Sequence, residues 1–306
     1  TNKRSLVHFN MANLRDIRNR ITSVNNTQQI TKAMKMVAAA KLRKAQDRMT
    51  QTRPYANTLS SVIGRLIQGQ ELTHPLLRET NESKRSLVIV VGSDRGLCGG
   101  FNNNLFKEVE LFIANNFEHG KDTDGLSLIT IGKKATAYFG KRLYSIDSKH
   151  PGFFDNLEYD LSTTLISEVM EDFINKEIDE VYLAYNEFKS VIAQNRKVEK
   201  ILPLKAEDLV VADTDNSVQS DYIYEPDQKA IIDELLPKHI KMQLWKAVLE
   251  SNASEQGARM TAMDSATENA KDLERSLRLK YNQARQSAIT TEISEIVSGA
   301  QALSDS

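Results

Sequence analysis

The sequence predicts an α+β chain in which a long antiparallel coiled coil of the N- and C-terminal helices flanks a smaller α/β domain. The first observation is that both ends are rich in strong helix formers, with one glycine and one proline between residues 11 and 68 and no proline after Pro237. Proline and glycine interrupt helices, so both stretches are expected to stay helical. The second is that short apolar runs alternate with helical patterns between them, which is typical of an α/β layer.

Length and composition exclude several classes of protein. The chain has 306 residues, of which 40% are hydrophobic, 13 are glycine and 6 are proline, unlike a collagenous or disordered chain. The single cysteine, Cys98, cannot form an internal disulfide, and the five histidines lack the spacing of metal ligands. No apolar run reaches the roughly 18 residues that span a bilayer. We therefore expect no metal, no cofactor and no membrane-spanning helix.

Charge is distributed unevenly along the chain. Residues 1–68 contain 13 Lys/Arg and two acids, a net charge of +11, whereas residues 227–306 contain 10 and 12, a net charge of −2. The total charge of −1 leaves −10 for residues 69–226. A basic N-terminal segment of this kind is typical either of an arm that binds nucleic acid or of a helix that meets an acidic protein surface.

The N-terminal segment is expected to be a helix over residues 12–75, preceded by an extension at residues 1–11. Its apolar residues recur every three or four positions, as in the seam of a coiled coil. We place two slips in this spacing, around Thr27–Gln29 and Val37–Ala40, where the winding should deviate from an ideal supercoil. The predicted seam residues are Leu14, Ile17, Ile21, Val24, Ile30, Met34, Val37, Ala38, Leu42, Ala45, Met49, Ala56, Leu59, Ile63 and Leu66.

The C-terminal segment, residues 227–306, is expected to be a second helix, unbroken from Lys238 to about Leu303. It is the longer of the two, so its last turn should extend past its partner as a single helix. Both helices leave the same middle segment and therefore pair most simply in antiparallel orientation; separate globular helices are the alternative. The predicted seam residues are Ala266, Ala270, Leu273, Leu277, Ala284, Ala288, Ile289, Ile293, Ile296, Ala300 and Leu303.

The middle segment, residues 84–212, is expected to form a Rossmann-like α/β domain with parallel strands. Apolar runs of strand length occupy Ser86–Gly92, Leu126–Gly132 and Val181–Phe188, with Val198–Pro203 as one more strand. Helical patterns lie between the first three strands, at Asn104–Phe117, Lys133–Arg142 and Ser162–Lys176. The stretch Asp213–Asp221 is expected to be an exposed polar loop.

A glycine-rich turn, Gly92–Phe101 (GSDRGLCGGF), follows the first predicted strand, where a dinucleotide-binding domain would hold phosphate. Its spacing fits neither G-x-G-x-x-G nor a loop with G-K-[ST], so we interpret it as a tight strand-to-helix turn. Cys98 lies in this turn near Arg95, but no histidine follows within the motif to act as a base. His74, before Pro75, is interpreted as a turn residue. The sequence thus offers no catalytic residue.

Four segments carry a family resemblance: Met11–Arg48 (MANLRDIRNRI and TQQITKAMKMVAAAKLRKAQDR), Ser93–Asn102 (SDRGLCGGFN), Tyr224–Pro226 (YEP) and Leu249–Leu303 (beginning LESNASEQGARMTAMDSATENA). In this order, over nearly the whole chain, they resemble the gamma subunits of F-type ATP synthases, which form the central rotor stalk. The resemblance implies a non-catalytic subunit that couples ion flow through a membrane ring to ATP synthesis or hydrolysis at beta-subunit sites. It implies the same coiled coil and α/β domain.

The resemblance also implies partners and contact residues. The coiled coil would thread the head of alpha and beta subunits, and the α/β domain would be the foot on the ring of c subunits with an epsilon or delta-type subunit, with one copy of the chain per complex. The matching positions are Lys32, Met34 and Lys35, which would face an acidic loop of beta; Arg285 and Gln286, which would hydrogen-bond another beta loop; and Ala300 and Leu303, which would sit in an apolar bearing.

Two departures from the family bear on the setting. No cysteine-bearing insertion like that of chloroplast relatives is present, so control by thiols is not expected. The family usually begins at the position of Met11, so Thr1–Asn10 is an addition, and the retained Met11-Ala12 favours the cytoplasmic face of a bacterial plasma membrane over the matrix face of the mitochondrial inner membrane. A nucleic-acid-binding coiled coil and a nucleotide-dependent α/β enzyme are the rival hypotheses.

Overall fold

The computed structural model describes residues 2–67, 74–78, 85–117, 125–204, 225 and 227–304, with side chains from Leu14 onward. The chain divides into two compact units. The sheet unit consists of residues 38–260, and the helix-end unit consists of Thr1–Val37 with Thr261–Ser306. The expected polar loop at Asp213–Asp221 lies outside the described residues.

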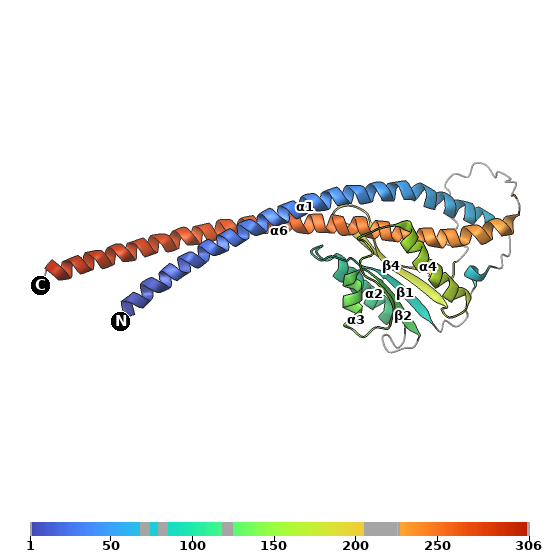
Figure 1. Cartoon of the computed structure of the whole chain (residues 1–306), viewed down its shortest axis with the longest axis horizontal. Coiled ribbons are helices and arrows are strands. Elements are labelled where there is room, and N and C mark those ends of the chain that lie inside the picture. The colour runs from blue at the N-terminus through green and yellow to red at the C-terminus, as the bar shows by residue number, and fades with distance from the viewer. Residues whose placement is uncertain are drawn as a thin grey trace. The chain divides into compact units, whose positions relative to one another are not determined.

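A five-stranded sheet with the strand order β3-β2-β1-β4-β5 forms the centre of the sheet unit (Figure 1). Strands β1 to β4 pair in parallel, and β5 pairs with β4 in antiparallel orientation. The predicted α/β fold with parallel strands is therefore confirmed. The strands are β1 (Ser86–Val91), β2 (Leu126–Ile131), β3 (Ile146–His150), β4 (Glu180–Phe188) and β5 (Gln194–Leu202).

Two features of the sheet were not anticipated. Strand β3 has the sequence IDSKH, which carries too few apolar residues to stand out, because an edge strand buries little of its surface. Strand β5 begins at Gln194 rather than Val198 and runs antiparallel to β4. The connection at residues 189–193 is too short for a crossover, so only an antiparallel pairing is possible there.

Helices cover both faces of the sheet. On one face, α2 (Phe101–Asn116) and α3 (Lys133–Gly140) pack with Val88 and Val90. On the other, α4 (Tyr159–Ile174) packs with Leu87, Ile89 and Val91. All of β1 is buried, as expected of a central strand whose alternate side chains enter two cores. The three helices predicted in this segment are confirmed.

The two long helices are α1 (Asn2–Ile67) and α6 (Gln228–Ser304). Pro54 lies inside α1 and Pro237 inside α6, and neither residue ends its helix. Helix α1 begins before the expected residue 12 and ends before the expected residue 75. A 3-10 turn begins instead at Pro75, because proline lacks the N–H that would continue an α-helix but suits a first position.

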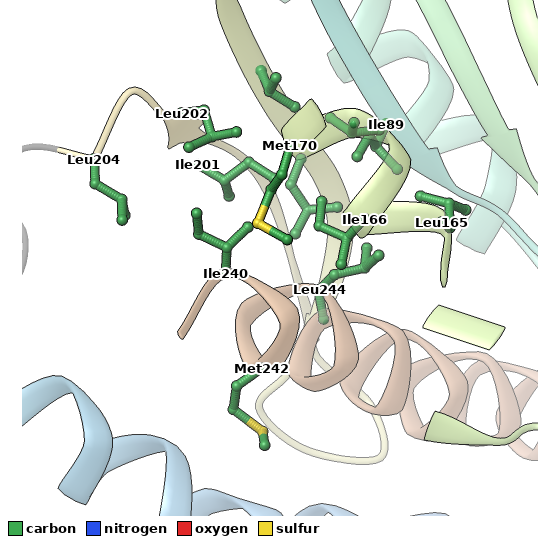
Figure 2. Close-up of a cluster of buried hydrophobic side chains, with 14 of the residues drawn as sticks. Ile89, Leu165, Ile166, Met170, Ile201, Leu202, Leu204, Ile240, Met242 and Leu244 are labelled. Atoms are coloured by element: carbon green, nitrogen blue, oxygen red, sulfur yellow. The ribbon is translucent and has the colours of Figure 1, made fainter. Parts of the chain in front are cut away.

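One apolar core joins the α4 face of the sheet to both long helices. Ile63 of α1 and Ile240 of α6 are fully buried and belong to the same cluster as Ile89 of β1. Figure 2 shows Ile240 pointing from α6 toward Met170 of α4, while Met242 points to the opposite side of α6. Residues 56–66 of α1 and 232–248 of α6 therefore contribute side chains to the core of the sheet unit.

The buried and half-buried positions of α1 follow an unbroken three-four spacing, so the two expected slips are wrong. The spacing continues through Gln28, Thr31 and Lys35, which are polar and were therefore missed. Ile30 and Val37, expected in the seam, are 59% and 57% exposed. The seam positions are Leu14, Ile17, Ile21, Val24, Gln28, Thr31, Lys35, Ala38, Leu42, Ala45, Met49, Thr52, Ala56, Leu59, Ile63 and Leu66.

Within the helix-end unit, α1 and α6 run antiparallel, as predicted. Thr31 Oγ1 lies 2.8 Å from Thr267 Oγ1, and Lys35 Nζ lies 2.5 Å from Asp264 Oδ1, so partner numbers fall as α1 numbers rise. Leu273 was wrongly expected in the seam and is 51% exposed. The seam of α6 in this unit runs through Met263, Thr267, Ala270, Glu274, Leu277, Tyr281, Ala284 and Ala288.

The last turns of α6 are exposed, as expected of a helix end that extends alone. The exposed fraction is 55% for Ile293, 70% for Ile296 and 81% for Leu303. Ile289, Ile293, Ile296, Ala300 and Leu303 were also expected to continue the seam, and this is wrong because they are exposed.

Replacing Ile240 by Ala tests the shared core. We expect Ile240→Ala to lower the free energy of unfolding by about 2–5 kcal/mol, because a fully buried side chain is lost and a cavity remains. The matched control is Ile192→Ala, since Ile192 is 82% exposed and its loss should change stability by no more than about 0.5 kcal/mol. Urea unfolding followed by circular dichroism measures both, and equal midpoints would contradict the role of Ile240.

Candidate functional surfaces

The glycine-rich turn joins β1 to α2, and its polar groups are bonded within the turn and to neighbouring loops. Asn102 accepts from the Ser93 amide at 3.0 Å and donates to Ser93 Oγ at 2.7 Å. Leu97 and Gly99 both have positive φ, 62° and 58°, which reverses the backbone before α2 begins. The interpretation as a strand-to-helix turn is confirmed.

Asp94 joins this turn to the loops that follow β2 and β3, at the carboxyl edge of the sheet. Its Oδ1 accepts from the amides of Lys133 at 3.0 Å and Gly152 at 2.7 Å, and its Oδ2 accepts from the amide of Phe154 at 3.0 Å. Sequence reasoning did not assign Asp94 a role, because its partners come from distant positions in the chain. The three amides therefore donate to a carboxylate of the chain itself.

Helix α6 lies against the place where a doubly wound sheet holds a ligand. Strands β2 and β4 flank β1, and the strand order reverses between β1 and β4, which marks the usual ligand crevice at their carboxyl ends. Ser251 Oγ donates to the Val91 carbonyl at the end of β1 at 3.4 Å. Ser254 Oγ donates to the Asn186 carbonyl of β4 at 3.1 Å. The crevice is therefore filled by the chain's own helix.

Arg259 of α6 adds a contact between this helix and the glycine-rich turn. Its guanidinium donates to the carbonyls of Arg95 at 3.1 Å and Gly96 at 3.2 Å, and it pairs with Glu255 at 2.6 Å. Burial raises the pKa of the Glu255 carboxyl, and the Arg259 charge opposes that rise. At this contact the turn presents carbonyl oxygens to a cation, whereas a phosphate-binding loop presents amide N–H groups to an anion.

A cleft of about 420 Å³ lies beside this contact, within the sheet unit. Lys41, Lys44 and Arg48 line it from α1, and Asp94 and Arg95 line it from the turn. The Asp94 carboxylate already accepts three backbone amides. The cleft thus brings basic side chains of α1 near the turn, whose Arg95 and Gly96 carbonyls accept from Arg259.

Cys98 is held inside the turn rather than presented to solvent. It is 2% exposed and packs with Phe101 and Ala258. Burial raises the pKa of its thiol, against the opposing effect of the Arg259 charge. The thiolate is the reactive form of cysteine, and a raised pKa makes it scarcer at neutral pH. We therefore interpret Cys98 as a packing residue rather than a nucleophile.

The described residues form neither a metal-binding cluster nor a membrane-spanning helix. Among residues 2–67, 74–78, 85–117, 125–204, 225 and 227–304, no group of three His, Cys, Asp or Glu side chains is placed to hold a metal ion. No helix in the same part of the chain is both long and apolar enough to cross a membrane.

The residues expected to face an acidic loop of beta lie on α1 in the helix-end unit, but they do not share one environment. Lys32 is exposed, whereas Met34 is half-buried. Lys35 occupies a seam position, and its ammonium contacts Asp264. Lys32 is therefore the most exposed of the three.

The expected contact residues of α6 are exposed. Arg285, Gln286 and Ala300 lie outside the seam, and Leu303 is 81% exposed. Sequence reasoning missed a further exposed apolar surface on α1, made of Ile30, Met36 and Val37. The heptad spacing, carried through the polar residues Gln28, Thr31 and Lys35, would have placed these side chains outside the seam.

Known proteins match this chain over nearly its whole length. A family model described as ATP synthase matches residues 13–303. The ATP synthase gamma chain of Chlorobium phaeobacteroides is 50% identical over 296 residues, covering 96% of this chain and 99% of that protein. The gamma chain of Chlorobaculum tepidum is 49% identical over 294 residues, with the same coverage. The chain belongs to the ATP synthase gamma family.

Solved structures of ATP synthase rotors share the fold. The central stalk and c-ring structure of the Tetrahymena thermophila mitochondrial ATP synthase contains a chain that matches with a TM-score of 0.57 and 25% identity, covering 78% of this chain and 99% of that one. A chain of the Euglena gracilis mitochondrial enzyme matches with a TM-score of 0.63 and 20% identity, covering 95% of each. The predicted fold class is confirmed by both.

The burial of Cys98 predicts slow labelling by a thiol reagent. Because its pKa is raised, the thiolate fraction at pH 7–8 is smaller than that of a free cysteine and grows only as the pH rises further. We expect the native chain to react with Ellman's reagent at least about tenfold more slowly than the same chain in urea. The chain contains one cysteine, so the signal has a single source. Equal rates would show that the turn opens readily.

Proposed function

We propose that this chain is the rotating central shaft of an ATP synthase, as its family membership implies. It would couple ion flow through a membrane ring to ATP synthesis or hydrolysis at the beta subunits. The observation that carries the proposal is the identity of 50% over 296 residues with an ATP synthase gamma chain, together with two long helices that pair along a continuous seam.

The mechanism rests on asymmetry. A stiff shaft that is not three-fold symmetric presents a different face to each of three equivalent catalytic sites, so its angle biases which site binds or releases nucleotide. The coupling is reciprocal, because a site that favours one shaft angle also drives the shaft toward that angle. Helices α1 and α6, which continue through Pro54 and Pro237, supply the length that such a shaft needs.

We infer that the head contacts the exposed faces of the helix-end unit. On α1, Lys32 supplies an exposed cation beside the half-buried Met34, and Ile30, Met36 and Val37 supply exposed apolar area. On α6, the exposed Arg285 and Gln286 would meet another beta loop, and Ala300 and Leu303 would enter an apolar bearing. Lys35 belongs to the same level of the shaft and has the separate role argued below.

The sheet unit would be the foot on the ring of c subunits, beside an epsilon or delta-type subunit. The charge of −10 over residues 69–226 sets this segment apart from the basic helix that would meet the head. The alpha and beta subunits, the epsilon-type subunit and the ring would be the partners, with one copy of this chain. The bacterial relatives favour the cytoplasmic face of a plasma membrane, with the mitochondrial matrix face as the alternative.

The geometry of the crevice argues against one rival function, and a salt titration would test the other. An α/β enzyme that uses a nucleotide would need the crevice beside β1 and β4, which α6 occupies through Ser251 and Ser254. A nucleic-acid-binding coiled coil would use the basic face of α1 against phosphates, and its affinity would fall steeply with salt. We therefore propose a non-catalytic subunit.

Two measurements test the proposal. Native mass spectrometry of the complex isolated from its source should find one copy of this chain with three alpha and three beta subunits. The purified chain should neither hydrolyse ATP nor bind it in a calorimetric titration, because the crevice is filled and the turn presents carbonyls. Turnover by the isolated chain would refute a non-catalytic role, and absence of the head subunits would refute the shaft.

Replacing Met34 by Lys tests the head contact. The new cation would join Lys32 opposite an acidic beta loop and hold the rotor at one angle. We expect Met34→Lys complexes to assemble and hydrolyse ATP but to pump fewer ions per ATP, with the defect shrinking as ionic strength rises. ATPase activity and ATP-driven ion pumping are measured together in reconstituted vesicles.

The control for this prediction adds the same charge elsewhere on α1. Gln51 is exposed in the sheet unit, so Gln51→Lys should leave the pumping ratio unchanged. An unchanged ratio in Met34→Lys at low salt would refute the contact. Failure to assemble would instead place the half-buried Met34 in the packing of the two helices.

A further inference from the structure

Among the described side chains of the helix-end unit, three polar contacts join α1 and α6 in or directly beside the seam. The Asn25 amide, turned so that its nitrogen faces α6, donates to the Glu274 carboxylate at 3.0 Å. Two turns further on, Thr31 Oγ1 lies 2.8 Å from Thr267 Oγ1, and Thr31 is 8% exposed. The third contact is the ion pair of Lys35 Nζ with Asp264 Oδ1 at 2.5 Å. Thr31 and Lys35 occupy seam positions of α1, and Asn25 directly follows the seam residue Val24.

Lys35 differs from an ordinary surface lysine because it occupies a position that a coiled coil normally gives to an apolar residue. Thr31 and Ala38, its seam neighbours on α1, are 8% and 1% exposed, so Lys35 lies between two buried positions. Its ammonium emerges beside Asp264, and the two side chains are 40% and 52% exposed. A lysine at such a position costs stability and selects one register, because only one alignment brings an opposite charge to it.

The surrounding charges make this selection specific. The next acid on the same flank of α6 is Glu268, four residues from Asp264 and therefore about 6 Å further along the axis. Lys271 already lies 3.6 Å from Glu268 on the same helix. Exchanging partners would require a slip of a whole turn, which would also separate Thr31 from Thr267.

We propose that Lys35 is a positioning residue of the rotor, whose ion pair with Asp264 fixes the register and rotation of α1 against α6 at the level of Met34. The role rests on the proposed shaft function. It differs from the role that the family resemblance implies for Lys35, which is direct contact with an acidic loop of beta. In this arrangement Lys32 and Met34 meet the head, and Lys35 determines the angle at which they do so.

Exchanging the two charges distinguishes these roles. Lys35→Glu alone sets two carboxylates together, and Asp264→Lys alone sets two ammonium groups together, so each should weaken the register. The double variant Lys35→Glu/Asp264→Lys restores an opposite pair across the same seam. If Lys35 acted directly on an acidic loop of beta, Glu at this position would repel that loop, whatever residue 264 is.

The first measurement uses ATPase activity and ATP-driven ion pumping of reconstituted complexes. We expect each single variant to lower the number of ions pumped per ATP by about two- to fivefold at low salt, the range that an exposed ion pair can shift a two-state equilibrium. The double variant should restore the ratio to nearly that of the unmodified complex, and Lys35→Arg should retain it. These effects should shrink at high ionic strength.

Lys32 supplies the matched control. It is exposed on the same turn of α1, and it lies outside the seam. Lys32→Glu should lower the pumping ratio through its contact with the head, and adding Asp264→Lys should not restore it. Rescue of Lys32→Glu by Asp264→Lys would overturn the assignment of the register to Lys35, because the effect would then depend on total charge alone.

The second measurement follows thermal unfolding of the isolated full chain, which does not depend on any partner. The double variant should recover the unfolding midpoint that the single variants lose. Recovery of both the midpoint and the pumping ratio supports the proposal. Recovery of the midpoint without recovery of pumping overturns the positioning role, and no recovery of either overturns the ion pair itself. If the unmodified chain failed to assemble with head subunits, the shaft function would fail instead, while the midpoints would still test the register.

Discussion

The side chains of β1 that face α4 are apolar and must be buried. The two longest helices, α1 and α6, pack with α4 to bury them. Leu87, Ile89 and Val91 lie in one cluster with residues of α4, α1 and α6. Fully burying a side chain of this size contributes about 1.5–3 kcal/mol, so a cluster shared by β1, α4, α1 and α6 holds these four elements together. The contacts of α6 at Ser251, Ser254 and Arg259 follow from that placement.

That placement puts α6 where a doubly wound sheet usually binds its ligand. The crevice at the carboxyl ends of β1 and β4 is occupied by hydroxyls of α6, and Arg259 reaches the carbonyls of the glycine-rich turn. Asp94 accepts three backbone amides from the loops that follow β2 and β3. The features that would bind phosphate in another protein thus join the helix to the sheet in this one.

The helix-end unit depends more on polar contacts between its helices than on an apolar core. Its seam contains Gln28, Thr31 and Lys35 on α1 and Thr267 and Glu274 on α6, so apolar burial is limited. Polar pairs contribute little net stability, but they penalise any alignment that leaves them unpaired. A seam of this composition is less stable than an apolar one but favours a single register. In the proposed shaft, a single register would hold the outward faces of the helices at a fixed angle.

The sequence by itself determined the classes of structure: two long helices, alternating strands and helices between them, and a turn that fits no phosphate-binding pattern. These follow from local properties, namely helix propensity, hydrophobic period and glycine spacing, which each segment carries alone. Only the tertiary structure decided that β5 is antiparallel, that Asp94 joins three loops, and that Lys35 rather than Ile30 or Val37 lies in the seam. The physical reason is that a polar side chain becomes favourable in a seam only when a partner from the other helix meets it, and that partner is more than two hundred residues away in the chain.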